Sequence, residues 1–202
     1  MVNTEFIEKY FAEMTQILEN ISREEIDRVV EALYSAWRDG RTIFLMGNGG
    51  SASTATHFAC DLSKVTLSAG KPRMRAISLC DNPALLSALT NDEGFEHIFS
   101  EQLRSLMRVG DVLIGISVHG GSGADKAGLW SQNLLRAMRV AKEEFQAVLI
   151  GFSGFDGGTF REIADLCLTV PFPSTPHVES FHLVLEHLIT FCLKEKIAAC
   201  VH

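Results

Sequence analysis

Five short apolar runs, separated by stretches of helical pattern, constrain the fold of this 202-residue chain more than any other feature. Runs of this length, without polar alternation, are typical of strands buried on both faces of a parallel sheet. We expect strands at Thr42–Met46, Arg75–Ser78, Val112–Ser117, Ala147–Phe152 and Leu166–Val170. Helical stretches lie between them, near Ala52–Leu62, Pro83–Leu89, Phe95–Leu106, Leu129–Glu143 and Thr159–Ala164. Strands that alternate with helices form βαβ units, so the sequence predicts an α/β fold: a doubly wound, mostly parallel five-stranded sheet flanked by helices.

Apolar residues recur at helical spacing at both ends of the chain, which adds a helical pair before the sheet and a long helix after it. The pair falls within residues 1–40, where Ser22 and Glu25 have the spacing of a capping box at the start of the second helix. The long helix covers Val178–Ala199 and is apolar over much of its surface. Together these helices offer more apolar surface than one small domain buries. This indicates an oligomer that uses residues 1–40, and a long buried helix in a monomer is the alternative.

Length, charge and cysteine content narrow the class of protein. A chain of 202 residues fits one domain, and we expect residues 1–202 to form it. The formal net charge of −7 leaves no basic surplus for nucleic acid or an acidic membrane. No apolar run approaches the ~20 residues of a membrane span. Five cysteines without a C-x-x-C pair, and an N-terminus without the pattern of a secretory signal, favour a cytoplasmic protein with reduced thiols.

Two loops rich in glycine and serine follow predicted strands and suit the binding of a phosphate. They are Gly47–Ser51 and Ser117–Gly123. Glycines let backbone N–H groups approach an anion, helix N-termini add partial positive charge, and serine hydroxyls donate hydrogen bonds. The alternative for the first loop is a tight strand-to-helix turn. No Gly-Lys-Ser/Thr follows the glycines, and Ala52 stands where a G-x-G-x-x-G motif needs its third glycine. Nucleotide hydrolysis and dinucleotide binding are therefore disfavoured.

Histidines and carboxylates recur on two of the predicted helices. His57 and Asp61 are four residues apart, which puts both side chains on one helical face. The last predicted helix carries four more such residues at helical offsets: Glu179, His182, Glu186 and His187. Such a set can build a divalent-metal site or an acid–base pair. The alternative for each residue is a solvated or hydrogen-bonded helix position, and for His182 a packing histidine.

Several short segments, spread in order over nearly the whole chain, carry a family signature. They are Gly47–Ser51, His57–Ala59, Ala88–Phe95, Gly110–Ser117, Asp156–Gly158 and Val170–Pro171. In these segments the chain resembles the phosphoheptose isomerase group of SIS (sugar isomerase) domains. The resemblance implies a homotetramer with active sites between subunits. It also implies isomerisation of a small-molecule phosphosugar, sedoheptulose 7-phosphate, to D-glycero-D-manno-heptose 7-phosphate through an enediol.

The same resemblance implies roles for individual residues. Asp61 and His187 match the acid–base pair of the family. The zinc site of many members falls on His57, Asp61, Glu179 and His187. Phosphate and other substrate contacts fall on Gly49, Gly50, Ser51, Asn91, Asp92, Ser117, His119, Ser122 and Glu179.

The chain departs from the family pattern around the sugar. Asp61 stands where the family has Glu, and Glu179 where it has Gln. His119 replaces a usual Ser and is either an extra phosphate donor or an exposed loop residue, while Gly123–Trp130 looks like an insertion. These departures keep two alternatives open. One is a non-catalytic SIS protein, like the replication-initiator-associating regulator, and the other is an isomerase or sensor for another phosphosugar. Histidine and carboxylate on both helices favour an enzyme.

Overall fold

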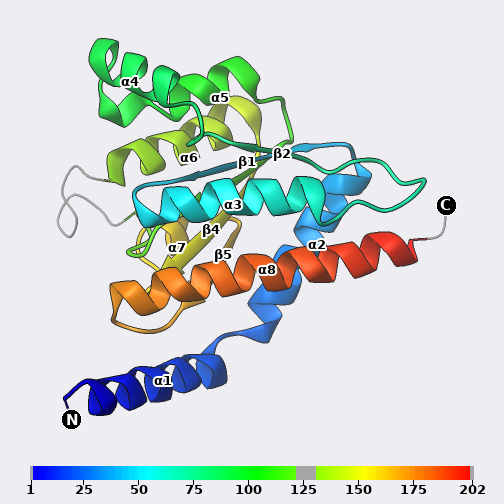
Figure 1. Cartoon of the computed structure of the whole chain (residues 1–202). Helices are drawn as coiled ribbons and strands as arrows, with labels where there is room; N and C mark the ends of the chain where they lie inside the picture. The colour runs from blue at the N-terminus through cyan, green and yellow to red at the C-terminus, as the bar shows by residue number, and fades with distance from the viewer. Residues whose placement is uncertain (1, 122–130, 201–202) are drawn as a thin grey trace.

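The five predicted strands form one parallel sheet in the order β2-β1-β3-β4-β5 (Figure 1). The computed structural model describes residues 2–121 and 131–200. The strands are β1 Thr42–Gly47, β2 Arg75–Ser78, β3 Val112–Ile116, β4 Val148–Gly154 and β5 Leu166–Val170. The residues of β1 and β3 are all buried, because helices cover both faces of the sheet there. The predicted fold class is therefore confirmed.

Helices form a layer on each face of the sheet. They are α1 Val2–Asn20, α2 Arg23–Arg38, α3 Gly50–Lys64, α4 Pro83–Asp92, the 3-10 helix η1 Phe95–His97, α5 Ser100–Leu106, α6 Gln132–Phe145, α7 Phe160–Ile163 and α8 Thr175–Ala199. Alternate side chains of β1 point to opposite faces of the sheet, so each set packs against one of the two helical layers. Ile43 and Leu45 pack with α2, α3 and α8, whereas Phe44 and Met46 pack with α5, α6 and α7. In the first layer α3 and α8 run side by side (Figure 1).

Among the described helices, side-chain hydrogen bonds cap the N-termini of α2 and α4. The hydroxyl of Ser22 accepts a hydrogen bond from the Glu25 N–H at 3.1 Å, as the capping spacing predicts. The predicted helix Phe95–Leu106 is instead divided into η1 and α5. The Ser100 hydroxyl donates to the His97 carbonyl at the point of division, and such side-chain bonds compete with a continuous helix. Within the described residues, no helix combines the length and the hydropathy that crossing a membrane requires.

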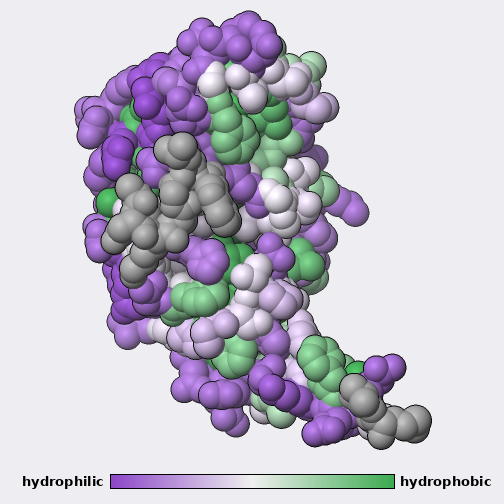
Figure 2. All heavy atoms as spheres, turned by 90° about the vertical axis from the view of Figure 1, so that its left-hand side faces the viewer, coloured by the Kyte–Doolittle hydropathy of each residue, from purple (hydrophilic) through white to green (hydrophobic). Residues whose placement is uncertain are grey.

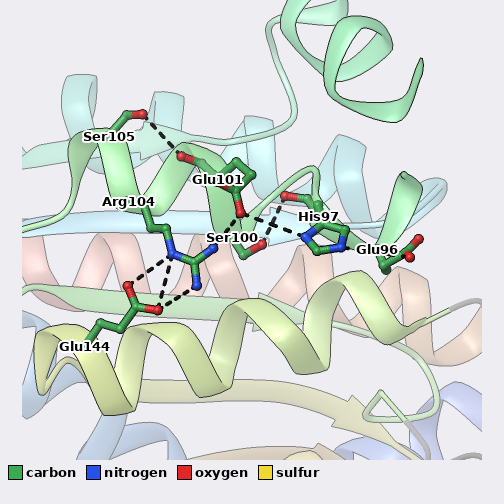
Figure 3. Close-up of polar contacts among 7 residues, drawn as sticks. All are labelled: Glu96, His97, Ser100, Glu101, Arg104, Ser105 and Glu144. Carbon is green, nitrogen blue, oxygen red and sulfur yellow. Dashed lines mark hydrogen bonds and ion pairs between the residues drawn. The ribbon is translucent and has the colours of Figure 1, made fainter. Parts of the chain in front are cut away.

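The layer that holds α5 and α6 carries an ion-pair cluster of its own. Arg104 of α5 bridges Glu101 of the same helix and Glu144 of α6, with N···O distances of 2.5 Å and 2.6 Å (Figure 3). Glu144 raises the pKa of the Arg104 guanidinium, and Arg104 lowers the pKa of the Glu144 carboxyl. The pairs are exposed to solvent, so they contribute little net free energy to the packing of α5 on α6.

Helix α1 stands off the rest of the molecule (Figure 1). It contacts the start of α8, where Tyr10 stacks on His177 at 4.1 Å and Glu13 lies 3.3 Å from the same ring. Most of its large apolar side chains remain exposed: Phe6, Ile7, Phe11 and Leu18. Figure 2 shows apolar surface on this projecting helix. A helix of this kind presents an unpartnered apolar face.

Candidate active site

The first predicted phosphate loop lies at the point where the strand order reverses. Strand β1 pairs with β2 on one side and β3 on the other, and Gly47 and Ile116, the last residues of β1 and β3, are in register. The loops that follow the two strands therefore start next to each other, at the position where open parallel sheets bind ligands. Gly49 has a φ of 57°, a left-handed conformation that favours glycine, and α3 begins at the next residue.

The second loop, after β3, is fixed by hydrogen bonds of its own. The Gly121 N–H donates to the Ser117 hydroxyl at 3.0 Å, and the Gly120 N–H donates to the Ser117 carbonyl at 3.0 Å. A side chain at Gly120 would clash with the Gly157 carbonyl, because its Cβ would lie 1.9 Å from that oxygen. Glycine is therefore needed at position 120, where the loop after β3 packs closely against the loop that contains Gly157.

The two loops enclose a small pocket of about 130 Å³. We call it the phosphate pocket after its predicted ligand. Its lining includes four of the predicted substrate residues: Ser51, Ser117, His119 and Glu179. Asn48 closes one side through two hydrogen bonds with Asn133 of α6, at 3.0 Å and 2.8 Å. Ser122 and the predicted insertion Gly123–Trp130 lie outside the described residues, as does the start of the predicted helix Leu129–Glu143.

The side chain of Glu179 extends from α8 to the first loop. A Cβ at Gly50 would lie 2.7 Å from Glu179 Oε1, so Gly50 leaves the space that this carboxylate occupies. The N-terminus of α3 carries partial positive charge, which favours the carboxylate there. The same charge would favour a phosphate, so Glu179 places a negative charge at the pocket predicted to bind one.

The second part of the site is a cluster of possible metal ligands contributed by α3 and α8. One ligand atom from each of His57, Asp61, Glu186 and His187 lies within 4.8 Å of the others. Asp61 Oδ2 is 3.5 Å from His187 Nε2, and Asp61 Oδ1 is 3.8 Å from His57 Nε2. Glu179, which the family resemblance places in the metal set, lines the pocket between the two loops in this structure, and Glu186 lies in the cluster.

Glu186 has an unusual environment for a carboxylate. Its side chain is fully buried, whereas the side chains of His57 and His187 are 46% and 41% exposed. Burial raises the pKa of Glu186 to about 8, with a contribution from the nearby negative Asp61. The two histidines therefore face solvent, and Glu186 closes the inner side of the cluster. Two imidazoles and two carboxylates are ligands that zinc accepts, so the residues present fit a divalent metal.

An open depression of about 600 Å³ lies along the same helix. It is lined by Ala52, Ser53, Thr56, His57, Cys60 and Cys80. The phosphate pocket includes Ser51, one residue before this lining begins. The site thus runs from an anion pocket at the start of α3 towards the His57 cluster. No sequence pattern marks this depression, because its shape depends on how β2 and α3 pack.

Three other residues singled out in the sequence lie elsewhere. Asn91 and Asp92 are at the exposed end of α4, where the Asn91 amide donates to the Asp92 carboxylate at 2.6 Å, and neither lines the phosphate pocket. His182 is buried, and its Nε2 lies 3.0 Å from the Ser153 carbonyl. Burial lowers the pKa of His182 to about 4, so it stays neutral. His182 is therefore a packing histidine, which was the alternative for this position.

Fold and site together define a phosphosugar-binding α/β protein. A model of the SIS domain family matches residues 9–125. A phosphoheptose isomerase of Geotalea daltonii is 37% identical over 190 residues, which cover 90% of this chain and 91% of that one. The solved phosphoheptose isomerase GmhA from Neisseria gonorrhoeae is similar in structure, with a TM-score of 0.83 and 31% identity over 95% of this chain and 98% of that one. The chain belongs to the SIS domain family and, within it, to the phosphoheptose isomerases.

One relative has a different name. The lincomycin biosynthesis protein LmbN of Streptomyces lincolnensis is 42% identical over 163 residues. The match covers 79% of this chain and 58% of the length of LmbN.

Proposed function

We propose that this chain is an aldose–ketose isomerase that converts sedoheptulose 7-phosphate to D-glycero-D-manno-heptose 7-phosphate through an enediol. The observation that carries the proposal is the pairing of Asp61 with His187, whose Oδ2 and Nε2 atoms lie 3.5 Å apart. Both side chains are partly open to solvent, as groups that exchange protons with a substrate must be. Membership of the phosphoheptose isomerases supports the choice of substrate.

The proposed reaction moves one hydrogen from C1 to C2 without any external oxidant or reductant. Asp61 removes a proton from C1 while His187 donates a proton to the C2 oxygen, which gives the enediol. His187 then takes a proton from the C1 hydroxyl, and Asp61 returns its proton to C2. The products are the aldose and an enzyme in its starting protonation state.

The phosphate and the hydroxyls of the substrate are held by other groups in this proposal. Ser51, Ser117 and Ser122 donate to the phosphate with the amides of Gly49 and Gly50. His119 and Glu179 line the rim of the phosphate pocket. Asn91 and Asp92 are exposed at the end of α4, so they are available to the site of a neighbouring subunit in the proposed tetramer.

Zinc is part of the proposal. His57, Asp61 and His187 supply two nitrogens and an oxygen to the ligand cluster. When bound, the metal would polarise the substrate oxygens as a Lewis acid.

The proposed assembly and location rest on separate observations. The exposed apolar side chains of α1 support a homotetramer that uses residues 1–40, with the whole chain acting as one SIS domain. All five cysteines are free thiols, which supports a cytoplasmic location.

A second candidate is an isomerase for another phosphosugar. Two observations favour it: the 42% identity with the lincomycin biosynthesis protein, and the carboxylate of Glu179 at the phosphate pocket. A non-catalytic SIS regulator is the third candidate, and it would not need the Asp61–His187 pair.

The test is turnover of sedoheptulose 7-phosphate by the purified chain and by His187→Ala. We expect the variant to lose about 10²–10⁴-fold in kcat, the usual contribution of one general acid–base group, while it still binds the substrate. His97→Ala is the matched control, because His97 lies near Glu101 in the opposite layer and should leave kcat unchanged (Figure 3). A His187→Ala variant with full activity would end the proposed role.

A further inference from the structure

A second pocket with charged walls lies where the edge strand β5 starts. It has a volume of about 180 Å³ and is formed by α2, α7 and the first residues of β5. Its polar lining consists of Glu25 and Arg28 of α2, Arg161 of α7, and Asp165 and Cys167. We call it the β5 pocket. The active-site loops follow the opposite, carboxyl ends of the parallel strands, so the β5 pocket is separate from the phosphate pocket.

The two arginines of the β5 pocket have no ionic partner in the part of the chain that the structure describes. Neither the Arg28 nor the Arg161 guanidinium lies within 4.0 Å of a carboxylate oxygen of those residues or forms a side-chain hydrogen bond with them. The stem of Arg161 packs on Gly157, where a Cβ would lie 2.9 Å from the Cβ and Cδ of the arginine. Two unpaired guanidiniums, from two different helices, thus line one cavity.

The carboxylates in the same lining are already engaged by other groups. Asp165 Oδ1 accepts a hydrogen bond from Lys142 Nζ at 2.5 Å, and Asp165 Oδ2 accepts one from the Leu149 N–H at 2.8 Å. Glu25 Oε2 accepts from the Thr169 N–H at 3.4 Å. With Lys142, three cations face two carboxylates. The pocket is therefore a local positive site in a chain whose formal net charge is −7.

We infer that the β5 pocket binds a phosphoryl group, as a second anion site outside the active site. A guanidinium presents a planar fork of donors that one carboxylate fills with both of its oxygens. A phosphoryl group has three terminal oxygens and up to two negative charges, so it can accept from two guanidiniums at once and balance both. The inference goes beyond the proposed function, because none of the residues that it uses belongs to the proposed active site.

The size of the pocket limits the molecule that carries the phosphoryl group. A volume of about 180 Å³ corresponds to about six water molecules at roughly 30 Å³ each. Free phosphate fits, and so does a phosphate monoester with a short carbon chain. Glu25 Oε1, the oxygen that the Thr169 N–H does not use, can accept a hydrogen bond from a hydroxyl group of such an ester.

Binding at this position should stabilise the folded chain. Helices α2 and α7 both pack on β5, and a ligand held by Arg28 and Arg161 connects the two helices across that strand. A ligand that binds the folded state and not the unfolded state raises Tm.

The test is calorimetric titration of the full-length protein with inorganic phosphate, glycerol 3-phosphate and acetate, with Tm as a second readout. We expect the double variant Arg28→Gln/Arg161→Gln to bind one phosphate fewer per chain than the wild type, with a smaller rise in Tm. Each single variant should weaken this site about tenfold, the effect of one hydrogen bond to a charged group. The kcat and KM for sedoheptulose 7-phosphate should not change. Arg136→Gln/Arg139→Gln is the matched control, because it removes the same charge at exposed positions of α6.

The two phosphate probes distinguish the sources of the phosphoryl group. Tighter binding of glycerol 3-phosphate than of inorganic phosphate at this site would support the inference and assign the site to an ester. Equal Kd values would support it with free phosphate as the ligand. Three results would overturn it: a double variant with the stoichiometry and Kd of the wild type, an equal loss in the α6 control, or acetate that binds as tightly as phosphate.

Discussion

At the scale of single residues, the environments of three carboxylates set their different roles. Asp61 is partly exposed, with a side chain that is 14% accessible, and it lies beside His187. Glu186 is fully buried in the same cluster. Glu179 faces the N-terminus of α3 and lines the phosphate pocket. In the proposed function the carboxylate of Asp61 exchanges protons and that of Glu179 repels part of an anionic substrate, because the two groups differ in burial and neighbours.

Replacing Glu179 by glutamine should strengthen the binding of a phosphosugar. The substitution keeps the shape of the side chain and removes a negative charge from the phosphate pocket. Repulsion between two exposed like charges at about 4 Å amounts to about 1 kcal/mol in water, so we expect a Kd about fivefold lower. Calorimetric titration of Glu179→Gln with sedoheptulose 7-phosphate measures it. Glu195→Gln, at an exposed position later in α8, is the control for the lost charge. Weaker binding by Glu179→Gln would mean that the carboxylate accepts hydrogen bonds from the sugar.

At the scale of elements, α3 connects the two parts of the site. It begins at the phosphate loop, and His57 comes seven residues after Gly50, about 10 Å along the axis. This separation suits a sugar chain of several carbons between its phosphate and its reacting end. Helix α8 supplies the opposing side chains, and its packing on α3 brings His187 to Asp61.

His182 of α8 should make the stability of the protein depend on pH. The pKa of His182 is lowered from 6.5 in the unfolded chain to about 4 in the folded protein. The unfolded chain therefore binds a proton first as the pH falls, and stability is lost between about pH 6.5 and pH 4. From about pH 7.5 to pH 5 this histidine should cost about 2 kcal/mol.

Chemical unfolding of the wild type and His182→Gln, both metal-free, measures that cost. The glutamine can still donate to the Ser153 carbonyl but does not titrate in this range. Subtracting the two curves removes the contribution of Glu186, which is common to both proteins. We expect the difference in the free energy of unfolding to shrink towards low pH. A difference that is the same at pH 7.5 and pH 5 would show that His182 titrates as it does in the unfolded chain.

The same two helices show where prediction from sequence ends. The strands and the capping at Ser22 follow from local patterns, and the structure confirms them. The spacing of His57 and Asp61 also put them on one face correctly. Glu186 could not be chosen over Glu179 in this way, because both lie on α8 at helical offsets from its histidines. The choice depends on the rotation of α8 against α3, which tertiary packing sets. The sequence signal that pointed to Glu186 was its position next to His187 in a largely apolar helix.

At the scale of the whole molecule, α1 presents an apolar face that a single chain does not cover. The side chains of Phe6 and Phe11 are 66% and 63% exposed. Burying such aromatic side chains against another subunit contributes about 1.5–3 kcal/mol each. Their position supports the proposed assembly through residues 1–40.

Replacing Phe6 and Phe11 together by serine should therefore break the oligomer. We expect the wild type to sediment as a tetramer and the double variant as a smaller species at the same concentration. Analytical ultracentrifugation measures this directly. Glu8→Gln, on the same helix and exposed, is the control. A double variant that remains a tetramer would show that α1 is not part of the interface.

In the proposed reaction the Asp61–His187 pair moves a proton between C1 and C2 of a phosphoketose. Proton NMR of sedoheptulose 7-phosphate in D₂O, with and without added zinc, follows this transfer at the reacting carbons. We predict that an aldose heptose 7-phosphate accumulates with deuterium at C2, because a carboxyl that carries the proton exchanges it with solvent. No turnover and no exchange at C1, with binding still detected by thermal shift, would contradict the claim and favour another phosphosugar or a regulatory role.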